Sequence, residues 1–439
     1  MSHNLQATSS LDEWLSYLEH NHFKTIDLGL ERVKTVAREL DLLNPAPYVI
    51  TVGGTNGKGT TCRLLETVLL NAGLRVGVYS SPHLLRYNER VRIQNQELPD
   101  KLHTASFAFI ERHKTQSLTY FEFSTLSALD LFKQANLDVV ILEVGLGGRL
   151  DATNIVDADL AVITSIDIDH VDFLGSTREQ IAFEKAGIFR PDKPVVIGEP
   201  NIPHTMLAHA EALHCSLSCR DQQWHYRQNT QGWSWTDGKV RYENLPFCQI
   251  PLQNATTALA AIRQLPFDIS EQVIRDSLRQ VELTGRFQTL KPTRLKVLAQ
   301  SLNRATEKLP QVIIDVGHNP HAARYLAEKL TALKSTLTGK MIAVCGILQD
   351  KDAEGVLTPL LPLIDEWHCV TLTGPRGQSG EHLFVTLQQI AQAKQVGIQG
   401  QSHNSVAEGV KSAVLKSAEN DLVLIFGSFH TVAEFLQML

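Results

Sequence analysis

Cysteine is scarce in this sequence, and long apolar runs are absent from it. The six cysteines among 439 residues stand at positions 62, 215, 219, 248, 345 and 369, and none forms a Cys-x-x-Cys pair. No Cys/His pair follows Cys215 and Cys219 at the spacing of a zinc site, so metal or redox roles are not expected for these thiols. Scattered reduced thiols are typical of a cytoplasmic protein, which is the localisation we expect.

The apolar stretches end quickly in charge or glycine, and none approaches the ~20 residues that a membrane-spanning helix needs. The first residues also lack the basic and apolar regions of a secretory signal, so no membrane partner is expected. Basic residues number 41 against 47 acidic ones, a net charge of −6, and they form no cluster or stripe. Because proteins that bind nucleic acid usually carry a basic surface, nucleic acid is not an expected partner either.

The length predicts two or three domains of ordinary size, and a hydrophobic fraction of 43% suits full cores. In the first part of the chain, near-continuous apolar strands alternate with amphipathic helices, which predicts a mostly parallel sheet covered on both faces. The expected strands are 48–52, 74–79, 137–144, 158–166 and 194–197, and the expected helices include 123–133, 180–189 and 254–264. From 201 to 250, aromatic residues alternate with polar ones around glycines, which indicates a small antiparallel patch.

A second, smaller α/β domain is expected after a polar, basic segment that contains Pro292 and Pro310. There, strands at 312–314, 341–344 and 422–426 alternate with helices at 322–333 and from 431 onward. We therefore predict an α/β fold with a P-loop NTPase-like domain over 1–290, a linker over 291–310 and a Rossmann-like domain over 311–439.

The strongest functional signal is the run Gly53-Gly54-Thr55-Asn56-Gly57-Lys58-Gly59-Thr60-Thr61, which lies between an expected strand and an expected helix. Glycines let backbone N–H groups approach phosphate oxygens, and the helix N-terminus adds the positive end of its dipole. Lys58 would contact the β- and γ-phosphates, and a hydroxyl would bind Mg²⁺. The usual spacing G-x-x-x-x-G-K-[ST] is not met strictly, because Val52 replaces the first glycine and Gly59 separates Lys58 from Thr60. A glycine-rich loop with an incidental lysine is the alternative.

Two further strands end in polar groups that suit a metal bound to ATP. The strand over 138–142 ends in Glu143, and a carboxylate at the carboxyl end of such a strand can hold Mg²⁺. The strand over 158–166 is followed by Asp167-Ile168-Asp169-His170, whose imidazole can ligate a second Mg²⁺ or Mn²⁺. Pairing of Glu143 with Arg149 and a purely structural His170 are the alternatives.

The remaining candidates are one lysine and two residues near the second domain. Because the ammonium of Lys185 would be repelled by Mg²⁺, it either points away, which the residues alone favour, or is chemically altered into a carboxylate. Asp315, which follows the strand over 312–314, could hold ribose hydroxyls, and Arg286 could neutralise phosphate charge. A helix-capping aspartate and a surface arginine would give the same pattern.

Together these motifs resemble the Mur-type ligase superfamily of ATP-dependent amide-forming enzymes, whose variant P-loop GTNGKG[ST] is matched by residues 54–60. Within it, the chain is similar to the family of bifunctional dihydrofolate synthases/folylpolyglutamate synthases. The segments that carry this similarity are TIDLGLERV (25–33), SSPHL (80–84), RYNERV (86–91), TYFE (119–122), GLGGRLDATN (145–154), EKAGIF (184–189), GRF (285–287) and GSFH (427–430). The similarity is dense over the first 190 residues and sparse over 200–250 and 350–420.

The resemblance implies a reaction in which ATP phosphorylates a carboxylate and the amino group of L-glutamate attacks the acyl phosphate. The acceptors would be dihydropteroate, which becomes dihydrofolate, and reduced folates that are extended at their γ-carboxylate. The catalytic groups would be Lys58, Lys185 and His170, with Lys185 corresponding to a lysine that the family carries as a carbamate, N6-carboxylysine. The residues that correspond to phosphate contacts are Thr55, Asn56, Gly57, Lys58, Gly59 and Thr60, and those for two Mg²⁺ ions are Ser81, Glu143 and His170.

The resemblance also implies nucleotide contacts at Asn254, Arg286 and Asp315, and it places His318 near the ATP. The implied pterin-binding wall consists of Asp27, Leu28, Gly29, Leu30, Thr119, Tyr120, Phe121, Glu122, Leu150, Asp151 and Ala152. The sequence departs from the family in two places, since Gly317 replaces the alanine of DVAHNP and the stretch before Asp315 is longer and more basic. A monomer is the expected form.

Two other functions compete with this one. A cell-wall Mur ligase that adds an amino acid to a UDP-muramoyl substrate would normally carry a further N-terminal domain, and only residues 1–52 precede the glycine-rich loop here. A non-catalytic ATP-binding module would not need Lys58, Glu143, His170, Lys185 and Asp315 together. The folate ligase is therefore the function that the sequence favours.

Overall fold

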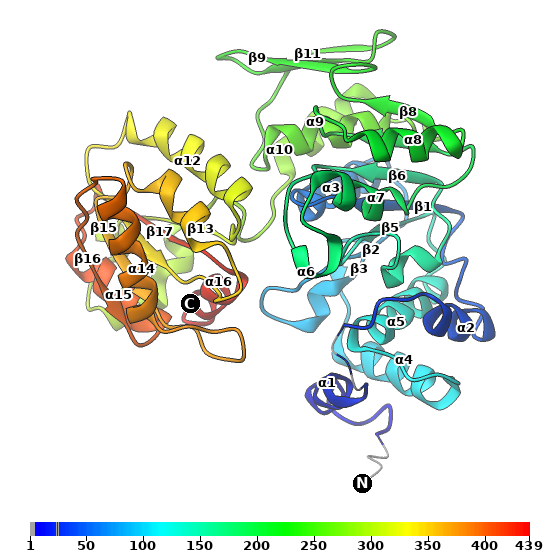
Figure 1. Cartoon of the computed structure of the whole chain (residues 1–439), viewed down its shortest axis with the longest axis horizontal. Helices are drawn as coiled ribbons and strands as arrows, with labels where there is room; N and C mark the ends of the chain where they lie inside the picture. The colour runs from blue at the N-terminus through cyan, green and yellow to red at the C-terminus, as the bar shows by residue number, and fades with distance from the viewer. Residues whose placement is uncertain (1–4, 23, 25) are drawn as a thin grey trace. The chain divides into compact units, whose positions relative to one another are not determined.

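The computed structural model describes residues 5–22, 24 and 26–439, and its contacts divide the chain into two compact units, Met1–Glu282 and Leu283–Leu439 (Figure 1). Each unit contains its own, mostly parallel sheet with helices packed on it. The predicted α/β class with two such parts is therefore confirmed.

Among the residues that the structure describes, the sheet of the first unit has eight strands, six of which run parallel. These strands are β1 (Tyr48–Gly53), β2 (Val76–Tyr79), β3 (Val91–Ile93), β4 (Gln96–Glu97), β5 (Val139–Glu143), β6 (Leu160–Ile163), β7 (Pro194–Ile197) and β8 (Ser216–Cys219). Their order is β4-β3-β2-β5-β1-β6-β7-β8, and only β3 and β4 pair antiparallel. Because β1 is central, the loop that follows it lies between the carboxyl ends of two parallel neighbours, β5 and β6.

Helices cover both faces of this sheet, as its apolar strands require. In β1, Ile50 and Val52 pack in the core on one face, and Val49 packs in the core on the other. The helices of the first face are α3 (Lys58–Asn71), α9 (Leu252–Ile262) and α10 (Glu271–Gln280). Those of the second face are α1 (Leu11–His20), α2 (Glu31–Glu39), α4 (Asp100–His113), α5 (Tyr120–Gln134), α7 (Arg178–Ala186) and α8 (His204–Ala212). Three shorter elements follow strands of this sheet along the chain. The 3₁₀-helix η1 (Tyr87–Arg90) follows β2, the 3₁₀-helix η2 (Ala152–Ile155) follows β5, and α6 (Val171–Leu174) follows β6.

The expected antiparallel patch is a three-stranded sheet of β9 (His225–Gln228), β10 (Trp233–Thr236) and β11 (Arg241–Leu245). The rings of Trp224, Trp235 and Tyr242 stack along it with centroids 6.2 and 6.0 Å apart and pack in the core of the first unit. The patch is shorter than predicted, because α8 and β8 take up residues 204–219 and β8 extends the parallel sheet.

The second unit is built on a six-stranded sheet in the order β12-β13-β17-β14-β15-β16, in which only β12 is antiparallel. Its strands are β12 (Gln288–Thr289), β13 (Gln311–Asp315), β14 (Met341–Cys345), β15 (Glu366–Val370), β16 (Gly400–His403) and β17 (Leu422–Phe426). Its helices are α11 (Lys296–Ser301), α12 (Pro320–Lys334), α13 (Ala353–Leu357), α14 (Gly380–Ala393), α15 (Val406–Lys416) and α16 (Phe429–Gln437), and its 3₁₀-helices are η3 (Pro292–Leu295), η4 (Thr306–Lys308) and η5 (Thr358–Leu360).

The division between the units differs from the expected linker over 291–310. It falls between Glu282 and Leu283, and η3, α11 and η4 occupy most of the supposed linker. Leu295, Leu298 and Ala299 are buried there, and β12 pairs with β13. The basic residues and prolines of this segment suggested an unstructured linker, but the segment folds and buries apolar side chains.

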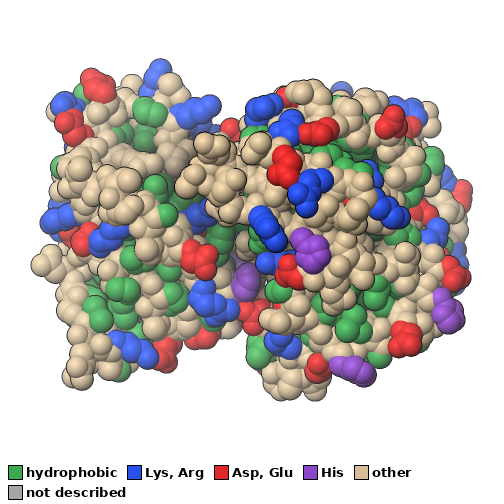
Figure 2. Space-filling model, turned by 90° about the horizontal axis from the view of Figure 1, so that it is seen from above, with side chains coloured by type: hydrophobic (Ala, Val, Ile, Leu, Met, Phe, Trp, Pro, Cys, Tyr) green, Lys and Arg blue, Asp and Glu red, His purple; other side chains and the backbone are tan. Residues whose placement is uncertain are grey.

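The surface shown in Figure 2 carries both signs of charge, with Lys and Arg side chains interspersed among Asp and Glu. Within the described part of the chain, no helix combines the length and the apolar character that crossing a membrane requires.

Candidate active site

The glycine-rich loop connects β1 to α3 in a backbone conformation that favours glycine. Gly54 and Gly57 have φ values of +141° and +87°, and α3 begins directly at Lys58. The Lys58 Nζ donates to the carbonyl oxygens of Gly54 (3.0 Å) and Thr55 (3.3 Å), so the ammonium folds back on the loop. The strand–loop–helix arrangement that a phosphate cradle needs is therefore present.

Residues that follow β6 hold this loop in place. Thr164 Oγ1 donates to the carbonyl oxygen of Asn56 (2.7 Å), and the backbone N–H of Asn56 donates to Ser165 Oγ (3.0 Å). The Thr55 hydroxyl lies 3.0 Å from both the backbone nitrogen and the carbonyl oxygen of Asp167. These bonds join segments more than a hundred positions apart in the sequence and fix the loop before any ligand binds.

Asn254, in the first turn of α9, packs directly against the loop. Its Nδ2 donates to Thr60 Oγ1 (2.8 Å), which in turn donates to the carbonyl oxygen of Gly57 (2.9 Å). A Cβ on Gly57 would lie 2.4 Å from Asn254 Oδ1, so only glycine fits beside this side chain. Asn254 therefore lies beside the glycine-rich loop, and its contact with a nucleotide stays a prediction.

Two of the expected metal ligands, Glu143 and Ser81, lie at the carboxyl edge of the same sheet. Glu143 ends β5, is the Cα partner of Val52 in β1 and is only 5% exposed. Ser81 follows β2, the other parallel neighbour of β5. A buried carboxylate and a hydroxyl are the kinds of oxygen donor that Mg²⁺ prefers.

The third expected ligand, His170, stands directly before α6 with a φ of +51°. Its Nε2 lies 4.0 Å from Asp169 Oδ2, and its side chain is 44% exposed. Across the described residues, no group of three or more His, Cys, Asp and Glu side chains is arranged to hold a metal ion. A metal at this edge therefore needs other ligands as well, such as the Ser81 hydroxyl or phosphate oxygens.

Lys185 lies in the last turn of α7 and is 4% exposed. Burial and, after it, the positive charge of Lys58 lower its pKa to about 7, while Asp169 and Asp151 oppose this shift. The amine is thus buried within electrostatic range of these three groups. Burial of the amine with electrostatic effects from Lys58, Asp169 and Asp151 disfavours the interpretation that the residues alone favoured, a Lys185 that points away from the charged site.

Arg32, in α2, connects two segments of the expected pterin wall. Its Nη1 lies 2.9 Å from Asp27 Oδ2, and its Nη2 donates to Glu122 Oε1 at 2.9 Å. The other carboxylate oxygen of Glu122 accepts from the backbone N–H of Thr119 (2.8 Å) in a capping box that begins α5. The segments 27–30 and 119–122 are therefore neighbours. Thr25, which begins the first similar segment, lies outside the described residues.

The third wall segment, Leu150 to Ala152, is organised by the buried carboxylate of Asp151. Its Oδ2 accepts from the backbone N–H groups of Gly145 (3.0 Å) and Leu146 (2.8 Å), and burial raises the pKa of this carboxyl. A Cβ on Gly145 would lie 2.6 Å from the ring of Phe121, so the 119–122 segment packs on this loop. Tyr120, next to Phe121, lies under the guanidinium of Arg90 at 5.5 Å.

In the second unit, two of the expected nucleotide residues, Arg286 and His318, lie near one aromatic ring. The guanidinium of Arg286 lies 5.3 Å from the ring centroid of Phe429, and the ring of His318 lies 6.1 Å from it. Asp315 is buried, which raises its pKa, and its carboxylate accepts from the backbone N–H groups of Phe287 (2.8 Å) and Gly317 (2.6 Å). These residues form a group of their own at the carboxyl ends of β13 and β17.

Sequence reasoning gave no role to Thr164, Ser165, Arg32 or Phe429. Phe429 stands in the GSFH segment, and Arg32 stands in TIDLGLERV, so both were within segments already singled out. Thr164 and Ser165 carried no such signal, because their partners in the glycine-rich loop are distant in sequence.

Two family models match the chain, one in each unit. The model of the Mur ligase middle domain matches residues 52–253, and the model of the Mur ligase glutamate ligase domain matches residues 294–429. With the strand–loop–helix and the buried lysine and glutamate described above, the chain belongs to the Mur ligase family, and within it to the dihydrofolate synthase/folylpolyglutamate synthase group.

Three proteins illustrate the similarity of the chain to this group. The dihydrofolate synthase/folylpolyglutamate synthase of Haemophilus influenzae is 70% identical over 431 residues, which cover 98% of both chains. The structure of Escherichia coli FolC in complex with DHPP and ADP has a TM-score of 0.90 and 52% identity, with 98% of both chains covered. A crystal structure of a bifunctional folylpolyglutamate synthase/dihydrofolate synthase with Mn, AMPPNP and L-glutamate bound has a TM-score of 0.87 and 50% identity, again with 98% of both chains covered.

Proposed function

We propose that this chain is an ATP-dependent ligase that joins L-glutamate to dihydropteroate, giving dihydrofolate, and to the γ-carboxylate of reduced folates. The observation that carries the proposal is the arrangement of Lys58, Glu143 and Lys185 around the carboxyl edge of one parallel sheet. The names and bound molecules of the similar proteins support the choice of substrates.

The reaction must overcome a poor electrophile, because a carboxylate resists attack by an amine. An oxygen of the acceptor carboxylate bonds to the γ-phosphorus of ATP while the bond to ADP breaks, which gives an acyl phosphate. The amino group of glutamate then adds to the acyl carbon, and the tetrahedral adduct expels inorganic phosphate and loses a proton. Holding the reactants together supplies a high effective concentration for both steps.

The glycine-rich loop would bind the phosphates of ATP. The loop backbone and the first turn of α3 present N–H groups, and the Lys58 ammonium can leave its two carbonyl partners for phosphate oxygens. Thr55, Asn56, Gly57, Gly59 and Thr60 line the same turn. The Lys58 charge would stabilise the transferring phosphoryl group.

Ser81, Glu143 and His170 fit divalent cations by the chemistry of their donors, a hydroxyl, a buried carboxylate and an imidazole. We propose that these residues hold two such ions with the phosphates. Once bound, the cations would neutralise the repulsion between two anionic reactants.

We propose that Lys185 carries a carbamate, N6-carboxylysine. Carbon dioxide adds to a neutral amine with loss of one proton, and a pKa of about 7 makes the neutral amine of Lys185 abundant at physiological pH. The carbamate is anionic, so it would orient a cation that the ammonium would repel. The geometry that supports this is the burial of Lys185 beside Lys58 and Asp169.

The remaining residues would hold the nucleotide and the pterin. Asn254 already bonds to the P-loop hydroxyl of Thr60, and Arg286 and Asp315, with His318 nearby, offer charge and hydrogen-bonding groups in the second unit. The pterin wall would be formed by the segments 27–30, 119–122 and 150–152, which Arg32 and Asp151 hold in place.

The direct test measures phosphate release by the purified protein with ATP and Mg²⁺. We expect release only when both L-glutamate and dihydropteroate are present, with dihydrofolate formed in equal amount. Replacing dihydropteroate with a UDP-muramoyl substrate should give none. Equal release without either organic substrate would contradict the proposal and indicate a simple ATPase.

The variant Lys58→Ala provides the control for this assay. Because Lys58 donates to two carbonyl groups of its own loop and to no core residue among those described, its loss should leave the melting temperature nearly unchanged while turnover is abolished. A variant that is unfolded at room temperature would instead make Lys58 a structural residue.

A further inference from the structure

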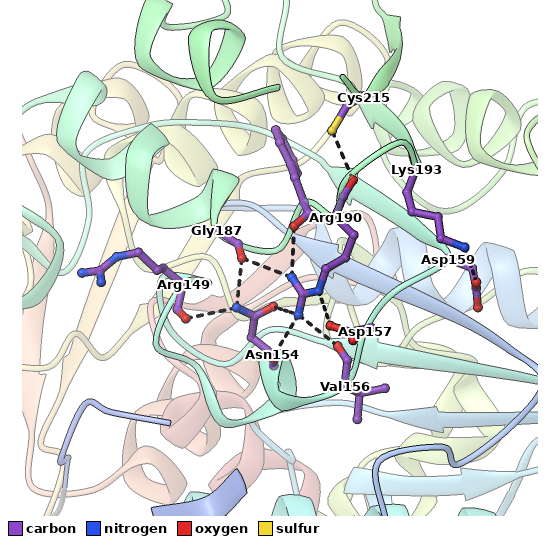
Figure 3. A network of polar contacts seen from close by, with 10 residues as sticks. Arg149, Asn154, Val156, Asp157, Asp159, Gly187, Arg190, Lys193 and Cys215 are labelled. Atoms are coloured by element: carbon purple, nitrogen blue, oxygen red, sulfur yellow. Dashed lines mark hydrogen bonds and ion pairs between the residues drawn. The ribbon is translucent and has the colours of Figure 1, made fainter. Parts of the chain in front are cut away.

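Arg190, four residues after the end of α7, is bonded to the main chain of two separate segments (Figure 3). Its Nη1 donates to the carbonyl oxygen of Phe189 (3.1 Å) and more weakly to that of Gly187 (3.4 Å). Its Nη2 donates to the carbonyl oxygens of Asn154 (2.9 Å) and Val156 (3.3 Å). One guanidinium thus links the end of α7 to the end of η2, and its side chain is only 18% exposed.

Asn154 completes the same connection from the other side. Its Oδ1 accepts from Arg190 Nη2 (3.0 Å), while its Nδ2 donates to the carbonyl oxygens of Arg149 (3.0 Å) and Gly187 (2.9 Å) (Figure 3). Every polar atom of the Asn154 side chain is therefore used. The third guanidinium nitrogen of Arg190, Nε, pairs with Asp157, whose side chain is 84% exposed, so this ion pair lies at the solvent-exposed edge of the network.

We call the hydrogen bonds of Arg190 and Asn154 the Arg190 clamp. The two segments that this clamp joins are also in backbone contact. The N–H of Arg149 donates to the carbonyl oxygen of Glu184 (2.7 Å), and a Cβ on Gly148 would lie 2.8 Å from that same oxygen. A Cβ on Gly187 would lie 2.5 Å from the Cα of Arg149. Two glycines thus allow the loop over 148–149 to approach the last turn of α7, the turn that carries Lys185, without a side chain between them.

We propose that Arg190, acting through Asn154, is a positioning residue for the ligase reaction, because it holds the Lys185 turn of α7 against the loop that carries Leu150, Asp151 and Ala152. This inference rests on the proposed function, in which Lys185 serves the metal and phosphate side and the loop serves the pterin. The clamp would keep Lys185 and the pterin-binding loop in a fixed position relative to each other. Neither Arg190 nor Asn154 touches a reacting group in this account.

The physical reason is that the two segments meet at Gly148 and Gly187, which have no side chains to interlock, although Ile155 and Phe189 anchor each segment in a core nearby. At this contact, sliding of one segment past the other is resisted by hydrogen bonds and by the ion pair between Arg149 and Glu184. A planar guanidinium can satisfy several carbonyl oxygens in fixed directions, which a lysine ammonium cannot. Misplacement of a reacting group by about 1 Å can lower a rate about a hundredfold.

The test compares Arg190→Gln, Asn154→Ala and their double variant with a matched control, Arg304→Gln. Arg304 is also partly buried and also bonds to main-chain carbonyl oxygens, those of Val414, Ser417 and Lys308, but in the second unit. For each protein we would measure hydrogen exchange of peptides over 145–156 and 178–190, the melting temperature, and kcat and KM for ATP, glutamate and dihydropteroate.

We expect faster exchange in both peptides for Arg190→Gln and Asn154→Ala, with kcat about tenfold to a hundredfold lower and the KM for ATP changed little. The double variant should lose no more than the worse single variant, because both residues serve one clamp. Arg304→Gln should show neither effect at a similar change in melting temperature. Arg190→Lys keeps the charge but lacks the planar guanidinium, so it should behave as Arg190→Gln does. If Arg190→Gln does not fold, Arg190→Lys takes its place in the comparison.

Unchanged kcat with faster local exchange would overturn the proposal, as would a loss of kcat equal to that of Arg304→Gln. Losses that simply add in the double variant would also contradict a shared clamp. Hydrogen exchange is measured without substrates, so a wild-type protein that shows no ligase activity would refute the proposed function while the exchange data still report on the clamp.

Discussion

At the scale of single residues, the site depends on charged groups that are buried close to one another. Lys185 is 4% exposed and has a pKa of about 7, first because of burial and then because of the charge of Lys58. Asp151 is also buried, and its carboxylate is held by backbone N–H groups of its own loop. Perturbed groups of this kind are typical of functional sites, since burial makes their charge depend on a neighbour or a ligand.

Lys185→Ala should abolish ligase activity, and short carboxylic acids such as formate should restore it in part, because a free carboxylate can take the place of the carbamate. In the wild-type protein, incorporation of carbon dioxide at Lys185 should rise as the pH rises through about 7, the pKa below which the amine is protonated and unreactive. Carbon-13 NMR of protein equilibrated with labelled bicarbonate would measure this signal.

Lys193→Ala is the matched control for that experiment. Lys193 belongs to the segment that follows α7, but its side chain is 46% exposed and pairs with Asp159. This variant should keep both the activity and the carbamate signal. A signal that persists in Lys185→Ala would show that the carbamate lies elsewhere, and a fully active Lys185→Ala would remove the residue from the mechanism.

At the scale of elements, the site is a β1–loop–α3 unit braced by the segments that follow β5 and β6. Hydrophobic periodicity predicted these strands and helices well, because burial on both faces leaves near-continuous apolar strands such as β5 and β6. It could not predict their order, since β1 pairs with strands that follow it by about 90 and 110 positions. The braces at Thr164 and Ser165, and the Arg190 clamp, depend on such pairings and left no local pattern in the sequence.

Gly57→Ala tests how tightly the loop is specified. Gly57 and Gly73 have nearly the same φ, +87° and +85°, but a Cβ on Gly57 would meet Asn254 whereas a Cβ on Gly73 would meet nothing within 4 Å. Gly73→Ala should therefore lower the free energy of unfolding by about 1 kcal/mol through the backbone alone. Gly57→Ala should cost more and should also weaken ATP binding, as urea unfolding and titration calorimetry would measure.

The pair of glycine variants is informative because the conformational cost of alanine at a positive φ is nearly the same at both positions. Equal unfolding free energies and an unchanged affinity for ATP in Gly57→Ala would mean that Asn254 moves freely, and the proposed role of Asn254 in nucleotide binding would lose its support.

At the scale of the whole molecule, the chain consists of two α/β units, each with polar side chains at the carboxyl edge of a parallel sheet. The sequence predicted two α/β parts and the central strands β1, β5, β6, β13, β14 and β17, but it missed β3, β4, β8, β12, β15 and β16. The resemblance to the Mur-type ligases supplied the residues that spacing alone left ambiguous. The linker was expected at later residues than the division between the units, because the segment that contains η3 and α11 is basic in sequence but buries Leu295 and Leu298. Lys185 was the residue most dependent on the resemblance, since repulsion from a metal argues against an unmodified lysine there.

The proposed reaction requires that the carboxylate of the acceptor is activated as an acyl phosphate. This step can be followed with dihydropteroate labelled with oxygen-18 in its carboxylate, in a reaction with ATP, Mg²⁺ and L-glutamate and with mass spectrometry of the phosphate. We expect each dihydrofolate formed to be accompanied by one inorganic phosphate that carries a single labelled oxygen. Unlabelled phosphate, or label found in AMP instead, would contradict it.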